Sequence, residues 1–400
     1  MKIEYRVLTD TQEMGEACQV FWRAMVGLPP LGDIDPVPGL EPGRFIGAFH
    51  DGRVVGCLDS YRSWLTVPGG ARIPSSAMTH LGVLPTHTRQ GIMRELAVRQ
   101  FTDSLRRGEI VGAMCPAEAH LHEKFGWAPA TSAVSARLHR SGARLRAPDH
   151  GRHEIRLVDQ PDARNVLSAI YEPIRWNGSI KRPDGWWLLH HLAQAAEPIK
   201  PYRAVHGRPG AEDGFVDYRP TNPDEWMHGY ERRIVVDDFV ALSRDAYHGL
   251  LQHLLSLDLV NLIDFHSLPA DDPLPELFTD RRVVRDVQLR DELWIRLLDV
   301  AAALSARTFR PTGSVVLEVL DPLFDFNNGC YDVSGDGVVR TTAPPGIRVD
   351  VAGLASAYLG GTKWWQLVAS RRAEELIPGA VEAADDLFAV ATLPYCGTSF

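Results

Sequence analysis

The stretch HLGVLPTHTRQGIMRELAVRQF, from His80 to Phe101, decides the fold of the N-terminal part of the chain. Its first residues are typical of a strand that ends at Pro85, a polar turn follows, and Gly91 opens a helix. Such a turn directs backbone N–H groups and a helix N-terminus toward one point, where a pyrophosphate can bind. Gly91 lets the backbone approach a ligand closely, and Arg89 adds a positive charge. The stretch therefore predicts a phosphate site, although the local pattern alone is common.

Strands and helices alternate around this stretch, which predicts a mixed α/β domain. A helix from about residue 9 to 25 begins with a capping-box pattern at residues 9–12. The stretch after it, residues 27–43, is too rich in Pro and Gly for regular structure. It is expected to be a surface loop that helps to determine which substrate binds. The expected strands cover residues 4–7, 45–49, 53–61, 77–84 and 109–115, and the remaining expected helices cover residues 91–107 and 118–125.

Two composition shifts divide the rest of the chain into further blocks. Residues 141–153 turn polar and basic, and a new α/β segment follows with an expected helix at 186–195 and strands at 215–218 and 233–240. The last block opens with LWIRLLDVAAALSAR. Its expected strands are 314–320 and 338–341, and its expected helices are 351–358 and 366–372. We therefore predict three blocks, residues 1–145, 146–290 and 291–400.

The composition excludes several classes of protein. Of the 400 residues, 45% are apolar and 23% are charged, which is ordinary for a globular protein. The net charge of −9 disfavours nucleic acid as a partner, and the apolar runs are too short to span a membrane. The N-terminal residues do not resemble a signal peptide. The five scattered cysteines form no CxxC pair, which disfavours disulfides and zinc, so a cytoplasmic protein without a metal is expected.

Three histidines, His80, His120 and His122, could share one pocket with Cys115 and Glu118. His120 and His122 point to different sides of a helix, so this group does not predict a metal site. His122 could instead pair on the helix surface with Glu118, one turn earlier. Glu118 could equally be a carboxylate that stabilises the helix N-terminus, and Cys115 a small buried residue after an apolar strand.

Phe21 and Trp22, on the first expected helix, could line an acceptor pocket. The same holds for Trp64 and Trp127. Aromatic side chains at such positions belong to the core more often than to a binding site, and both interpretations stay open here.

The turn at residues 83–93 resembles the acetyl-CoA loop of GNAT acetyltransferases, whose pattern is Arg/Gln-x-x-Gly-x-Gly/Ala. Thr88 stands where that family has Arg or Gln, and Met93 where it has Gly or Ala. The whole chain is similar to the Eis family of aminoglycoside and lysine N-acetyltransferases. The stretches that carry this resemblance follow the same order as in the family: VLPTHTRQGIMRELA, HEKFGWAPAT, DPLPELFTDRRVVRD, LWIRLLDVAAAL, YLGG and the terminal Phe400.

The resemblance implies a catalytic GNAT domain that binds acyl-CoA over residues 1–145. It implies a second GNAT-like domain without the CoA loop over residues 146–290, and a domain similar to sterol carrier proteins over residues 291–400. It also implies a hexamer. The residues that would hold the acyl-CoA are Leu81, Val83, Arg89, Gln90, Gly91, Ile92 and Glu118, the first two through backbone groups, and those that would contact the acceptor are Phe21, Trp22, His80 and His120.

Amide formation from a thioester needs a group that takes a proton from the amine and one that gives a proton to the thiolate. In Eis-like enzymes the C-terminal carboxylate is thought to be the base and a Tyr the acid. Phe400 would supply the carboxylate here, but the Tyr position falls on His122. An imidazole, with an ordinary pKa near 6.5, can accept or donate a proton at neutral pH, whereas a Tyr near 10 is a donor.

The sequence thus supports three hypotheses. The first is an N-acyltransferase that moves an acyl group from acetyl-CoA, or a related acyl-CoA, to a primary amine of a small molecule or peptide. The second keeps the fold but uses His122 as a general base for cyclisation, hydrolysis or isomerisation. The third is a ligand carrier without catalytic activity. The sequence does not identify the amine that accepts the acyl group. Arg23 stands where acidic groups would be expected around a polycationic acceptor.

Overall fold

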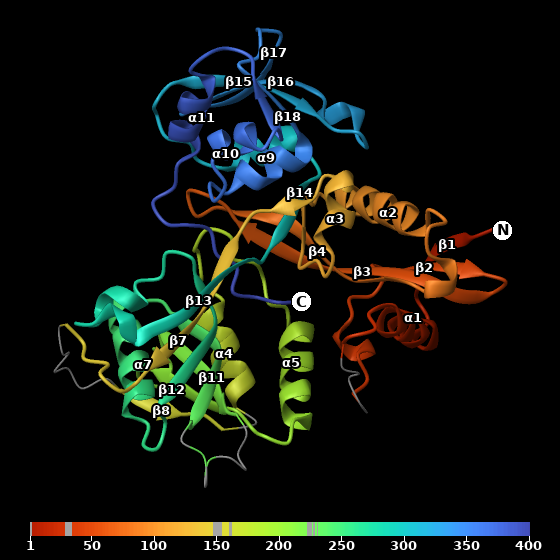
Figure 1. The fold of residues 1–400 in the computed structure, drawn as a ribbon. Helices are drawn as coiled ribbons and strands as arrows, with labels where there is room; N and C mark the ends of the chain where they lie inside the picture. The colour runs from red at the N-terminus through yellow and green to blue at the C-terminus, as the bar shows by residue number, and fades with distance from the viewer. Residues whose placement is uncertain are drawn as a thin grey trace. The chain divides into compact units, whose positions relative to one another are not determined.

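The structure is a computed structural model that describes residues 2–28, 34–146, 154–159, 162–221, 226, 229 and 231–400. Its chain forms two compact units. The first consists of Met1–Thr131, Arg175–Leu189 and Asp291–Phe400, and the second of Ser132–Ile174 and His190–Arg290. The expected mixed α/β fold is confirmed, with three β-sheets among the described residues (Figure 1). No helix within the described ranges is long and apolar enough to cross a membrane.

The first sheet lies in the first unit and has the strand order β1-β2-β3-β4-β5-β14-β6. Its strands are antiparallel neighbours except for β4 and β5, which are parallel. Their bounds are β1 Glu4–Val7, β2 Ile46–His50, β3 Arg53–Thr66, β4 Arg72–Val83, β5 Val111–Met114, β14 Trp294–Leu297 and β6 Ala128–Pro129.

Helices cover this sheet on both faces (Figure 1). Helix α1 (Thr11–Ala24) packs with Phe45 and Cys57 on one face, and α2 (Ile92–Arg106) packs with Leu58 and Met78 on the other. Neighbouring residues of a strand point to opposite faces, so an apolar strand such as β3 contributes to both cores. Two short elements follow β5, namely α3 (Ala119–His122) and the 3-10 helix Glu123–Phe125.

The start of α1 differs from the prediction. A capping box beginning at Thr9 was expected, but Asp10 is the N-cap, and its carboxylate accepts hydrogen bonds from the backbone N–H groups of Gln12 and Glu13. Asp ranks above Thr at this position, because its short carboxylate reaches the free N–H groups and carries the charge that the helix N-terminus favours.

Strand β14 comes from beyond residue 290, yet it completes the first sheet between β5 and β6. Conversely, β7 (Ser132–His139), within the block predicted for residues 1–145, pairs with β12 in the second sheet. Strand pairing depends on long-range contacts that periodicity along the sequence does not encode.

The second sheet has the order β13-β7-β12-β11-β10-β9-β8 and its own apolar core. Its further bounds are β8 Ile155–Leu157, β9 Tyr202–His206, β10 Gly214–Pro220, β11 Arg233–Ala241, β12 Leu262–Pro269 and β13 Val284–Asp291. The helices are α4 (Ala163–Tyr171), α5 (Asp184–Ala196), which crosses the boundary between the two units, and α7 (Arg244–Ser256).

The strand–helix–strand unit β11–α7–β12 repeats the parallel arrangement of β4–α2–β5. The connections differ sharply in length. Only Leu242 and Ser243 join β11 to α7, whereas residues 84–91 join β4 to α2. The second sheet therefore has no equivalent of the phosphate loop predicted in the first.

The third sheet lies in the first unit and has the order β17-β16-β15-β18-β19. Its elements are α8 Val300–Ala306, β15 Ser314–Leu320, β16 Gly329–Ser334, β17 Gly337–Thr341, β18 Ile347–Asp350, α9 Val351–Tyr358, α10 Trp364–Ala369, β19 Ala373–Glu375 and α11 Ala380–Phe388. Five more 3-10 helices connect elements of the chain: Val37–Gly39, Pro85–His87, Leu274–Leu277, Arg281–Val283 and Asp325–Asn327. Strand β15 and helix α9 have the bounds that the sequence predicts.

Candidate active site

A β-bulge in β4 organises the candidate site. Thr79 pairs with Asp59 of β3 and Gly82 pairs with Cys57, so His80 and Leu81 together lie opposite the single residue between them. His80 has a φ of +51°, in the left-handed region that residues other than glycine seldom adopt. Bulges redirect a strand and its side chains, and strained residues concentrate at functional sites.

Ahead of the bulge, β4 stops pairing with β5. The parallel ladder joins Ser75, Ser76 and Ala77 to β5 and then ends. Among the described strands, the remaining paired residues of β4, namely Met78, Thr79, Gly82 and Val83, pair with β3 alone. Backbone groups of Leu81 and Val83 therefore face an opening in the sheet, where an extended chain with amide groups could pair with them.

The predicted phosphate loop ends at an open helix N-terminus. Gly91 is the N-cap of α2 with a φ of +80°, and a Cβ placed there would meet no atom within 4 Å. Arg89, with a φ of +62°, and Gln90 are exposed beside it. Ile92 is buried, so it can face a phosphate only through its backbone N–H. The free N–H groups of this turn and the positive end of the helix favour an anion.

The structure brings Phe21, Trp22 and His80 together. The His80 ring lies 5.1 Å from the Phe21 ring and 5.9 Å from the Trp22 ring, measured between centroids. Its Nδ1 atom is 3.4 Å from Oδ2 of Asp59 on β3, a residue that the sequence analysis missed. Burial raises the pKa of Asp59, and the contact with His80 opposes that rise. An acidic residue inside an apolar strand was the available signal, because a buried charge needs a partner or a function.

The end of the chain is docked in the first unit. The Glu292 carboxylate accepts hydrogen bonds from the backbone N–H groups of Cys396 (2.9 Å) and Gly397 (3.0 Å). Arg182 donates through Nε to the Thr398 hydroxyl at 2.9 Å, and Trp186 donates through Nε1 to the Ser399 carbonyl at 2.8 Å.

The Phe400 ring meets Tyr61 of β3 edge-on, with 5.6 Å between ring centroids. Tyr61 and Asp59 are two residues apart on β3 and so lie on one face of the sheet. The docked tail and the His80 pair therefore share that face. The Cys115 thiol donates to the Thr398 carbonyl at 3.8 Å, and burial raises its pKa to about 12, so it is a neutral thiol rather than a nucleophile.

His122 is buried in α3, with 6% of its surface exposed, whereas His120 and Glu118 are exposed. The alternative of a surface pair between His122 and Glu118 is therefore wrong. Burial lowers the pKa of His122 to about 4, and Glu118 opposes that fall. The imidazole is consequently neutral at pH 7. Glu118 is the N-cap residue of α3, but its side chain makes no capping hydrogen bond.

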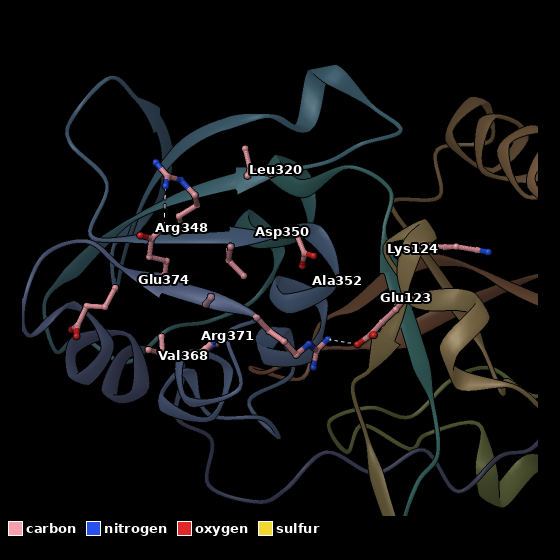
Figure 2. A pocket seen from close by; sticks show the side chains of 13 residues that line it. Glu123, Lys124, Leu320, Arg348, Asp350, Ala352, Val368, Arg371 and Glu374 are labelled. Atoms are coloured by element: carbon pink, nitrogen blue, oxygen red, sulfur yellow. Dashed lines mark hydrogen bonds and ion pairs between the residues drawn. The ribbon is translucent and has the colours of Figure 1, made fainter.

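A separate open pocket of about 810 Å³ lies against the third sheet (Figure 2). Two of its arginines are in ion pairs: Arg348 pairs with Glu374 of the lining and with Glu318, and Arg372 pairs with Glu123. None of the residues that the sequence predicts for the site lines this pocket.

Comparisons with known proteins agree with this architecture. Residues 4–130 and residues 178–297 match two models of the acetyltransferase (GNAT) domain, and residues 300–397 match the sterol carrier protein domain. The protein is thus an acetyltransferase with two GNAT domains and a C-terminal sterol-carrier-like domain.

The chain is 31% identical to the N-acetyltransferase Eis of Mycobacterium tuberculosis, over 90% of this chain and 87% of that protein. It is 32% identical to an uncharacterized N-acetyltransferase of Streptomyces griseus, over 92% and 91% of the two chains. The crystal structure of Eis1 from Mycobacterium abscessus superposes with a TM-score of 0.93 over both full chains at 47% identity. The chain belongs to the Eis family of GNAT N-acetyltransferases.

Proposed function

We propose that the first sheet carries out the transfer of an acetyl group from acetyl-CoA to a primary amine of a small molecule or peptide. GNAT acetyltransferases use acetyl-CoA as the donor. The observation that supports the proposal most is the opening between β4 and β5 next to the exposed N-terminus of α2. The opening would bind the pantetheine end of acetyl-CoA, and the N-terminus of α2 would bind its pyrophosphate.

In this proposal, the backbones of Leu81 and Val83 pair with the pantetheine amides. The turn at Arg89, Gln90 and Gly91 then binds the pyrophosphate, together with the backbone N–H of Ile92. The phosphates would gain hydrogen bonds from N–H groups that have no partner within the helix. Thr88 and Met93 depart from the family pattern, and Arg89 remains to supply positive charge.

The acceptor would bind on the α1 face of the sheet, against Phe21, Trp22 and His80, with exposed His120 as a further contact. The terminal carboxylate of Phe400 would receive the acceptor's ammonium group and begin its deprotonation, directly or through water. The hydrogen bonds of Glu292, Arg182 and Trp186 to the tail support this role, because a catalytic carboxylate must be held in place.

His122 would stabilise the leaving thiolate in its neutral form. Because burial keeps the imidazole uncharged at pH 7, its N–H can donate a hydrogen bond to developing negative charge, while the proton itself comes from solvent. Glu118, exposed at the start of α3, would lie at the edge of the same site.

We extend the proposal to the domains and the assembly. Catalysis would belong to the first predicted block, residues 1–145, supplemented by β14. The second block, 146–290, would not bind CoA, because Leu242 and Ser243 replace the loop. The block 291–400 would hold the tail. We expect a homo-oligomer, a hexamer by family analogy, and light scattering of the full chain tests this.

Calorimetry with CoA tests the donor site. We expect micromolar binding by the unchanged protein and none by Gly91→Trp, whose side chain would fill the open space at the helix N-terminus. Gly108→Trp is the matched control, since Gly108 lies at the other end of the same helix with a φ of +77° and a similarly open Cβ position. Absence of binding by the unchanged protein would reject the acyltransferase proposal.

One observation keeps a second function in view. A buried imidazole such as His122 is uncharged at pH 7 and can accept a proton, although its lowered pKa makes it a weak base. Cyclisation, hydrolysis or isomerisation at His122 is therefore the alternative if the chain binds no CoA.

A further inference from the structure

The contact between His80 and Asp59 has no role in the scheme above, although it lies at the β4 bulge beside Leu81. Asp59 is 2% exposed, and its Oδ1 atom has no hydrogen-bond partner among the described residues. Its other oxygen faces Nδ1 of His80 at 3.4 Å. Burying a carboxylate this completely is costly unless a cation or a strong donor accompanies it.

The geometry orients the His80 ring. Nδ1 is buried toward Asp59, while 14% of the side chain stays exposed. Because Nδ1 is the buried atom, the exposed part of the ring lies on the side away from Asp59, where Nε2 is. Nδ1 makes no hydrogen bond of ideal geometry with the described residues, but a tautomer with its proton on Nδ1, toward the carboxylate, leaves the lone pair on Nε2. An imidazole oriented by a carboxylate through one nitrogen and open at the other is the arrangement of a general base.

The surroundings explain how this ring is held. The rings of Phe21, Trp22 and Phe45 pack around it, with centroid distances from 5.1 to 6.2 Å. The Cys57 thiol donates to the His80 carbonyl at 3.2 Å, which fixes the backbone at its positive φ. A strained residue held on several sides indicates that its conformation serves a function.

We infer that His80 is the final acceptor of the proton that the ammonium group of the acceptor loses, and that Asp59 is its positioning residue. This inference rests on the proposed function. Nε2 of His80 first takes one proton from the ammonium group of the acceptor, and the neutral amine then attacks the thioester carbonyl, so that an N–C bond forms and the C–S bond breaks. The second proton leaves the attacking nitrogen for solvent. The thiolate leaves with the electron pair of the C–S bond and takes a proton from solvent.

Matching of basicity favours His80 over the terminal carboxylate as that acceptor. An α-carboxyl group with an ordinary pKa of about 3.5 attracts an ammonium ion but is a weak base toward it. An imidazole is better matched to proton transfer near neutral pH. The terminal carboxylate would bind the positive charge of the ammonium group, and the imidazole would remove its proton.

Several titratable groups among the described residues act on this pair or lie beside it. Cys57 on β3 and Cys18 on α1 lie nearby, and burial raises the pKa of both thiols, that of Cys18 to about 12. Glu41 acts on Asp59, and Asp35 acts on Cys18, both through charge. The thiols are neutral between pH 5 and 9, so they place no charge beside the ring.

The test compares His80→Gln with the unchanged protein on two acceptors, an alkylamine that is an ammonium ion at neutral pH and an arylamine that is not. We expect kcat for the alkylamine to fall about 100-fold or more, the usual contribution of a general base. The arylamine should lose less than about fivefold, because its attack product is acidic enough to release its proton to water.

His206→Gln is the matched control. His206 also contacts an aspartate, with Nδ1 at 2.6 Å from Oδ1 of Asp213, and its side chain is 12% exposed, but it lies in the second unit. Its activity should equal that of the unchanged protein. Asp59→Asn, which keeps the shape but removes the charge, should lower kcat about tenfold or more without changing KM for acetyl-CoA.

Calorimetry with CoA on each variant separates the possible outcomes. If His80→Gln binds CoA normally and keeps its alkylamine kcat within about threefold, well short of a general base's contribution, the inference is rejected and the acyltransferase proposal stands. If the unchanged protein binds no CoA or acetylates no amine, the proposed function itself fails.

Discussion

His122 shows how burial changes the chemistry that a residue type suggests. From the sequence, an imidazole at this position could be an acid or a base. In the structure it is 6% exposed, and burial lowers its pKa to about 4, so little imidazolium exists at pH 7. The charge state of a histidine depends on contacts made after folding, and for that reason the residue alone leaves its role open.

The stability of the protein should therefore depend on pH through His122. In the unfolded chain an imidazole titrates near 6.5, whereas the folded chain binds that proton only near pH 4. Between these values the unfolded state holds more protons, so the free energy of unfolding falls as the pH drops from 6.5 toward 4. The loss is on the order of 2 kcal/mol, allowing for partial access of solvent.

Urea unfolding at pH 7.0 and pH 4.5 measures this loss. His122→Gln should lose less stability between the two pH values than the unchanged protein, and His120→Gln, at an exposed position, should behave like the unchanged protein. Equal losses in all three proteins would mean that the His122 imidazole is not held neutral by burial.

Among the elements, β4 owes its position to a glycine. A Cβ at Gly82 would lie 2.8 Å from the backbone Cα of Phe21 in α1, closer than real contacts allow. Gly82→Ala should therefore push α1 away from the sheet and lower the free energy of unfolding by about 1–3 kcal/mol, the usual cost of overpacking. It should also raise KM for the acceptor, because Phe21 and Trp22 move with α1.

Thermal unfolding and steady-state kinetics check this effect. Gly15→Ala is the matched control within α1, since a Cβ there meets no atom closer than 4.0 Å. The close approach of α1 to β4 would be disproved if the two variants had the same stability and the same KM.

The tail is a second element whose position can be tested. In Glu292→Ala the backbone N–H groups of Cys396 and Gly397 lose their charged acceptor, which is worth about 1.5–3 kcal/mol for each such bond. We expect faster hydrogen exchange over residues 395–400 and a fall in kcat of about tenfold or more, with unchanged affinity for CoA.

Glu276→Ala, which removes an exposed carboxylate of the second unit, is the control and should change neither quantity. Slow exchange at the tail in Glu292→Ala would show that Arg182 and Trp186 hold it without Glu292.

Helices and strands with a clear local sequence pattern could be predicted. The strands with which they pair could not. Strand β15 alternates buried and exposed residues, and α9 begins at the N-cap Asp350, so both bounds agree with the prediction. Nothing within residues 294–297 indicates that β14 completes the first sheet, because its pairing with β5 joins residues far apart in the chain. The turn from β4 into α2 was predictable from a contiguous pattern, whereas the Asp59–His80 contact arises only from the register of β3 and β4.

At the scale of the whole molecule, the third sheet is not a detachable carrier. One apolar core contains Leu65, Val111 and Ala113 of the first sheet together with Leu317 and Tyr358 of the sterol-carrier-like part. Tyr331, Tyr358 and Trp364 are fully buried in this core. Their large side chains occupy the space around them, where a carried ligand would otherwise bind. This packing weighs against the third hypothesis, a ligand carrier, and ties the sterol-carrier-like part to the stability of the first sheet.

A pair of core substitutions tests that connection. Leu317 and Leu254 are both fully buried, the first in the core of the first unit and the second in the core of the second unit. Each change to Ala should cost about 2–5 kcal/mol. Because the first unit shares one core, Leu317→Ala should accelerate hydrogen exchange not only in β15 but also in β3, β4 and β5, residues far away in the sequence.

Leu254→Ala should accelerate exchange in β9–β12 and leave β3–β5 unchanged, since the second unit has a core of its own. Exchange measured by mass spectrometry on the full chain reports both patterns in one experiment. If the effect of Leu317→Ala stayed within residues 300–400, the sterol-carrier-like part would be an independent folding unit. In that case the tail could leave the first sheet without unfolding it, and the docked Phe400 would need support from Glu292, Arg182 and Trp186 alone.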